Sequence, residues 1–65
     1  MNSLSSEINE MELQNIRHLV LGYDMEADKY NCYAQDATDP SIKQFFQQSA
    51  QSATRNKQQL MQFLQ

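Results

Sequence analysis

The sequence has almost none of the residues that usually mark strands and turns: one Gly and one Pro in 65 positions. Folds built from short strands need frequent turn residues, so this scarcity argues against an all-β protein. The single Cys excludes an internal disulfide and fits a reducing compartment. No hydrophobic run approaches the ~20 residues of a membrane-spanning helix, and the first residues lack the pattern of a signal peptide. We therefore expect one small, cytoplasmic helical domain without membrane association.

Charge is divided unevenly along the chain. All eight acidic residues precede Pro40, and the two basic residues among them leave the first 39 positions at −6. The remaining positions carry Lys43, Arg55 and Lys57 and no acidic residue. An acidic segment beside a basic one favours antiparallel pairing, within one chain or across a dimer. Basic side chains interleaved with aromatics are missing, which argues against nucleic-acid binding.

Two long stretches repeat apolar positions alternately three and four residues apart, the pattern of an amphipathic helix. The first stretch has this spacing at Leu13, Ile16, Val20, Tyr23, Ala27, Tyr30, Ala34 and Ala37. The second has it at Ile42, Phe46, Ser49, Ala53, Asn56, Leu60 and Phe63. The pattern predicts two helices with one apolar seam each.

Capping residues set the expected helix bounds. Asn9, followed three residues later by Glu12, is typical of a capping box, and Asp39-Pro40 is typical of an N-cap followed by the first helical residue. We predict a mobile arm over residues 1–8 and a helical hairpin over 9–65, with helices over about 10–36 and 40–64. The short connection requires the two helices to be antiparallel.

The apolar face is wider than a single seam. Leu19 and Tyr33 flank the first seam, and Phe45 and Leu64 flank the second. Such a face suits a helix with two neighbours, as in a four-helix bundle, but a hairpin offers each helix only one. We therefore predict an all-α homodimeric four-helix bundle, with assembly of such dimers into higher multiples as an open alternative. Its core and dimer seam would comprise Leu13, Ile16, Leu19, Val20, Tyr23, Ala27, Tyr30, Tyr33, Ile42, Phe45, Phe46, Ala53, Leu60, Phe63 and Leu64.

Residues with catalytic chemistry do not form a recognisable set. Di-metal sites in four-helix bundles pair a Glu on one helix with Glu-x-x-His on another, and the second helix here contains no Asp, Glu or His. We expect no enzyme activity, no cofactor and no metal. Folding the hairpin at residues 37–40 places Tyr23 level with Ala53 and brings Val20 near Asn56. Two interpretations stay open: a small polar pocket, or a polar contact that sets the helix register.

A second apolar surface lies beyond the seam. Met11, His18, Met25 and Cys32 follow one another at intervals of seven residues, about 10.5 Å along a helix, which is too far for two of them to bind one ion. Such a column is typical of the border of a buried face or of a contact with a further subunit. Leu21, Met25 and Cys32 are the candidate partner face of a small protein-binding adaptor, our alternative interpretation.

Several of these residues resemble a known family. Tyr30-Asn-Cys-Tyr33-Ala34, the Asp39-Pro40 turn and the stretch from Ile42 to Ala50 resemble the first helical hairpin of rubrerythrin-type ferritin-like proteins. They are more similar still to the small CotF-type spore-coat proteins of endospore-forming bacteria. The resemblance spans roughly residues 9–65.

The resemblance implies a ferritin-like fold whose metal ligands are lost. The glutamate of the first helix falls at Tyr23, and the Glu-x-x-His pair falls at Ala53 and Asn56. These positions imply a vestigial metal site and argue against iron oxidation or storage, and a di-metal protein is the weaker alternative. The coat-like relatives imply a structural role, assembly with other coat proteins, and deposition on the spore.

Overall fold

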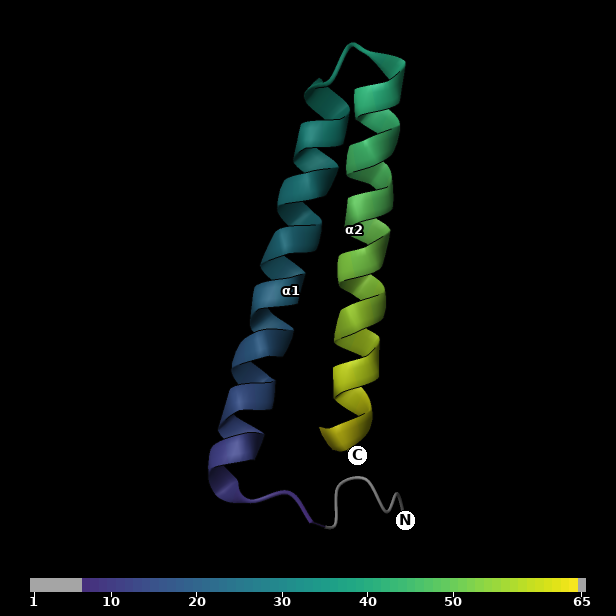
Figure 1. Ribbon diagram of the computed structural model, residues 1–65. Helices are drawn as coiled ribbons and strands as arrows, with labels where there is room; N and C mark the ends of the chain where they lie inside the picture. The colour runs from purple at the N-terminus through teal and green to yellow at the C-terminus, as the bar shows by residue number, and fades with distance from the viewer. Residues whose placement is uncertain (1–6, 65) are drawn as a thin grey trace.

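The protein is a helical hairpin, seen in a computed structural model that describes residues 7–64 (Figure 1). Helix α1 spans Glu10–Asp36 and helix α2 spans Pro40–Met61, with a final 3₁₀ turn, η2, over Gln62–Leu64. Both helices begin at the residues that the caps predict, and the second changes from α to 3₁₀ geometry near its expected end. The arm predicted for residues 1–8 lies outside the described residues except for its last two positions. Neither long helix in the described part of the chain meets the length and apolarity requirements of a membrane span.

Side-chain caps hold both helix starts, as the sequence predicts. The Asn9 side-chain oxygen accepts from the Glu12 backbone N–H at 2.8 Å, and the Glu12 carboxylate accepts from the Asn9 N–H at 3.1 Å. At α2, Asp39 Oδ1 accepts from the Ile42 N–H at 3.0 Å, and Pro40 occupies a position whose missing N–H costs no helical hydrogen bond. These caps satisfy donors that a helix start leaves without partners. The chain therefore turns back within three residues.

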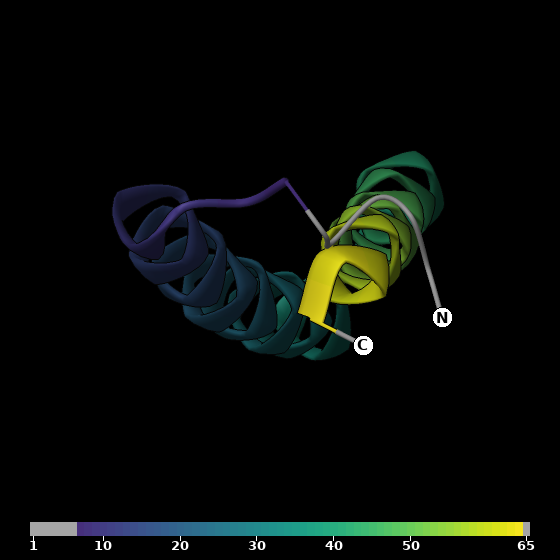
Figure 2. The same ribbon diagram turned by 90° about the horizontal axis from the view of Figure 1, so that it is seen from below.

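The two helices pack antiparallel but form a very small core. Only Ala34, Ala50 and Ala53 are buried among the described residues, each about 4% exposed. Small side chains permit close approach of the helices, and Figures 1 and 2 show the helices near each other at the turn and farther apart at the opposite end. Burial of a methyl group contributes only about 1 kcal/mol. The hairpin by itself therefore lacks a core of large side chains.

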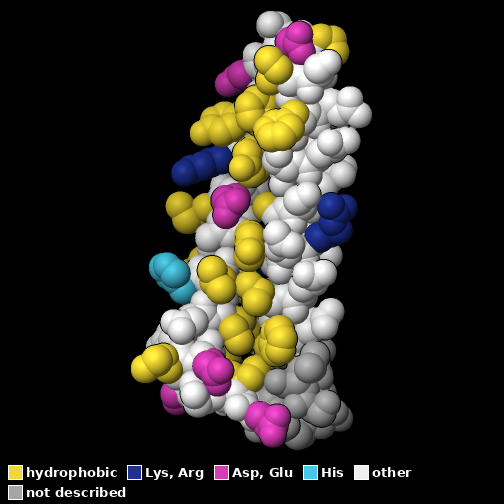
Figure 3. Space-filling model, viewed as in Figure 1, with side chains coloured by type: hydrophobic (Ala, Val, Ile, Leu, Met, Phe, Trp, Pro, Cys, Tyr) yellow, Lys and Arg dark blue, Asp and Glu magenta, His cyan; other side chains and the backbone are white. Residues whose placement is uncertain are grey.

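Large apolar side chains lie instead at the surface. Exposed examples in residues 7–64 are Met11, Leu19, Leu21, Met25, Tyr33, Ile42, Phe45 and Met61. Figure 3 shows hydrophobic side chains gathered in a band along the length of the hairpin, over α1 and its border with α2. A band of this length is larger than the scattered exposure that is normal for a monomer. It is a candidate interaction surface.

Replacing Gly22 with Ala is expected to stabilise the protein. A Cβ at Gly22 would meet no atom within 4 Å, so the residue serves no close helix approach. Gly in a helix interior costs about 1 kcal/mol relative to Ala. Gly22→Ala should raise the thermal midpoint, followed by circular dichroism, by about 4–8 °C. A lower midpoint would show that the glycine is needed in a contact outside the single hairpin.

Candidate functional site

Four aromatic rings form a cluster next to the turn. The ring of Phe46 lies 6.2 Å from that of Tyr30, in a stacked arrangement, and 5.4 Å from that of Tyr33, nearly edge-on. Phe45 extends the cluster along α2, with its ring centroid 5.8 Å from that of Phe46. Each such pair contributes about 0.5–1.5 kcal/mol beyond burial of its area. The cluster packs α1 against α2 near the turn, where the helices are closest.

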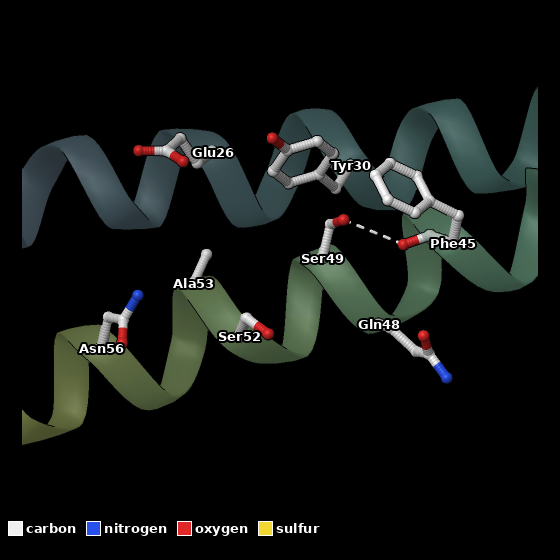
Figure 4. Close-up of a pocket in the computed structure, with 8 residues that line it drawn as sticks. All are labelled: Glu26, Tyr30, Phe45, Gln48, Ser49, Ser52, Ala53 and Asn56. Atoms are coloured by element: carbon white, nitrogen blue, oxygen red, sulfur yellow. Dashed lines mark hydrogen bonds between the residues drawn. The ribbon is translucent and has the colours of Figure 1, made fainter.

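Two grooves open beside this cluster. One, of about 390 Å³, is lined near the turn by Tyr33, Asp36, Ala37, Ile42 and Phe46. The other, of about 350 Å³, is lined by Glu26 and Tyr30 from α1 and by Phe45, Gln48, Ser49, Ser52, Ala53 and Asn56 from α2 (Figure 4). We call the surface formed by Tyr30, Tyr33, Ile42, Phe45 and Phe46 the aromatic face. It is continuous because its members share ring contacts or line the same grooves.

The second groove contains a carboxylate among mainly neutral groups. Glu26 and Tyr30 approach it from α1, whereas Ala53 and Asn56 point towards it from α2 (Figure 4). The Ser49 hydroxyl donates to the Phe45 carbonyl at 2.9 Å, so its proton is engaged within its own helix. Within residues 7–64, no Lys or Arg forms a salt bridge with Glu26. The groove resembles a polar pocket more than a reaction centre.

The structure brings together two of the three positions that the ferritin-like resemblance implies. Ala53 and Asn56 line one groove, to which α1 contributes Glu26 and Tyr30. Tyr23, one turn earlier in α1, is half-buried and is not among the lining residues. In residues 7–64, no three His, Cys, Asp or Glu side chains gather closely enough to bind a metal ion.

The half-buried row on α2 differs from the expected seam at two positions. Ile42 and Asn56 are exposed in the single hairpin, whereas Lys43 and Lys57 are half-buried. The face of α2 that packs on α1 is therefore rotated slightly about the helix axis relative to the expected seam. Ala50 and Ala53 are buried at the contact. Ile42 and Phe45 remain exposed at the border between the two helices, where each lines a groove together with residues of α1.

A single ion pair joins the two helices in the described part of the chain. Lys57 Nζ donates to Asp24 Oδ1 at 2.7 Å, with side chains 29% and 48% exposed respectively. Partly exposed pairs contribute about 0.2–1 kcal/mol, so the bridge fixes register more than it stabilises. The opposite charges of the two segments indicate such pairing, but the sequence pattern did not identify these partners.

The candidate partner face is accessible in the hairpin. Leu21 is 62% exposed and Met25 is 61% exposed, and Cys32 is an exposed free thiol. His18 is exposed as well. These residues belong neither to the aromatic ring cluster nor to the two grooves beside it.

Searches of protein-family descriptions, curated proteins and solved structures found no match to this chain.

Proposed function

We propose that the protein is a non-catalytic structural component whose hairpin pairs with a second copy to form a ferritin-like four-helix bundle. The observation that carries this proposal is the mismatch between the core and the surface. Within residues 7–64, three alanines form the buried core, while Ile42, Phe45 and Leu19 remain exposed. A 65-residue chain already has little apolar surface to bury, and doubling the hairpin is the economical way to bury more.

The groove chemistry supports a structural role over catalysis. Its polar members are a lone carboxylate, hydroxyls and amides, without the adjacent nucleophile and base of covalent catalysis. The resemblance to CotF-type spore-coat proteins implies where the protein would act. It would be made in the cytoplasm, deposited on the spore and held there in contact with other coat proteins. Repeated self-association is the property that such a shell requires.

Two measurements test the proposal on the full chain. Sedimentation equilibrium should give twice the chain mass of 7.6 kDa or a higher multiple. In a spore-forming host, the protein should be made late in sporulation and recovered from detergent-resistant spore extracts. A monomer at all concentrations contradicts the bundle, and recovery mainly from vegetative cytosol contradicts the coat role.

A second candidate function is a small adaptor, because Leu21 and Met25 form an exposed apolar surface apart from the aromatic face. An adaptor would bind another protein while remaining dimeric. Leu21→Asp or Met25→Asp should then abolish capture of that partner and leave the dimer intact. A dimer with unchanged partner capture in both variants contradicts the adaptor.

A further inference from the structure

The two sides of the hairpin differ in chemistry. On one side lie the aromatic face and its two grooves. On the other side, the hollows between α1 and α2 are lined by amides and a hydroxyl together with the cations Lys43 and Arg55; the neutral polar residues are Asn31, Gln35, Gln47, Gln51 and Thr54. Because such groups remain well solvated, the exposed rings and Ile42 of the aromatic face gain more from being covered.

The aromatic face continues the contact that holds the hairpin together. Phe46 is half-buried against both tyrosines, and Phe45 beside it is 61% exposed although its ring contacts that of Phe46. Ile42 lines the groove next to the turn and is also exposed. The aromatic cluster is thus packed like a protein core on its inner side and exposed to solvent on its outer side. Aromatic side chains in such positions are typical of the central residues of interfaces.

We infer that a second copy of the chain docks on the aromatic face, so that the four-ring cluster of each hairpin forms part of the bundle core. This inference rests on the proposed self-association and specifies its surface. The hairpin is 46 Å long and 18 Å wide. Its first 39 positions carry a net charge of −6 and the rest carry +3, so a second copy that places its acidic α1 beside the basic α2 of the first has complementary charge. A second hairpin has a matching length and an identical apolar band. A shorter partner would leave much of the band exposed.

Each groove on the aromatic side contains one carboxylate, Asp36 in the groove at the turn and Glu26 in the other. A second copy that covers the aromatic face also closes the groove beside it, in which Glu26 lies with Tyr30 and Phe45. Removing an ionised carboxylate from water without a paired cation opposes association. Neutralising Glu26 should therefore strengthen the dimer, whereas loss of an acidic side chain that lines neither groove, such as Asp28, should not.

The test compares dissociation constants of full-length variants by sedimentation. Phe45→Gln should raise the dimer dissociation constant roughly thirtyfold or more, as expected for a central aromatic residue. The matched control is Leu21→Gln, which removes a side chain of nearly equal exposure, 62% against 61%, from the candidate partner face. It should leave the constant within about twofold, as is usual for exposed positions outside an interface.

A gain in affinity provides a second measurement, which misfolding cannot imitate. Glu26→Gln should lower the dissociation constant about tenfold, and Asp28→Asn, which removes one charge from the same helix, should leave it nearly unchanged. Dissociation by Leu21→Gln with a normal dimer in Phe45→Gln overturns the proposed surface but leaves self-association standing. Equal changes of the dissociation constant in Glu26→Gln and Asp28→Asn would likewise overturn the proposed surface and leave self-association standing. A wild-type chain that is monomeric throughout overturns both proposals.

Discussion

Tenfold dilution of the protein will lower its thermal midpoint by about 5 °C if folding and dimerisation are one process. The physical reason is the composition of the core. With three buried alanines among the residues that the structure describes, we expect that the hairpin alone does not offset the ordering of its backbone, which costs about 1–2 kcal/mol per residue. The missing apolar burial must come from a second chain. Mass action then makes the free energy of unfolding depend on protein concentration.

The measurement is circular dichroism between about 1 and 100 µM protein, with sedimentation at the same concentrations. Each tenfold change in concentration alters the free energy of a dimer by about 1.4 kcal/mol. Helicity and mass should decrease together on dilution. A midpoint that stays constant across this range, with full helicity and a monomeric mass, would mean that the hairpin is stable alone and that its apolar band serves another partner.

The elements of the hairpin could be predicted closely from the sequence because local chemistry determines them. Asn9 with Glu12, and Asp39 with Pro40, specify where helices start regardless of the rest of the fold. Regular spacing of apolar residues specifies that both segments are helical. With one short connection between them, antiparallel packing is the remaining arrangement.

The rotation of each helix about its axis was less predictable. Periodicity locates an apolar stripe, but a stripe broad enough for two neighbours does not show which part contacts the nearer one. Small side chains occupy the closest contact: Ala50 and Ala53 are buried, whereas Phe45 and Ile42 stay exposed at the border between the helices. This arrangement follows from size, because two helices that meet through Ala approach more closely than two that meet through Phe.

The candidate groove was predicted only in part for the same reason. The resemblance brought Ala53 and Asn56 to attention, and both line the groove. It matched them with Tyr23, which is half-buried in α1 one turn before Glu26, the residue that lines the groove. A difference of three residues is nearly one helical turn, which neither a repeat of seven nor a short motif can resolve.

Phe46→Ala should be the most damaging single truncation near the turn. Phe46 has three aromatic neighbours, with centroids between 5.4 and 6.2 Å away, and it also lines the groove beside Ile42. Removing the ring eliminates all three contacts and leaves a cavity between the helices. Large-to-small substitutions of buried aromatic residues cost about 3–5 kcal/mol; because Phe46 is half-buried, we expect about 2–3 kcal/mol.

Urea denaturation of the dimer measures this loss, with Leu21→Ala as the control because Leu21 is exposed on the other side of α1. Ala is the better helix former, so any destabilisation by Phe46→Ala must arise from tertiary packing. Leu21→Ala should change the free energy of unfolding by no more than about 0.5 kcal/mol. Equal losses in the two variants would show that the cluster does not hold the helices together. A large loss confined to Phe46→Ala would identify the turn-proximal rings as the part of the hairpin on which both folding and docking depend.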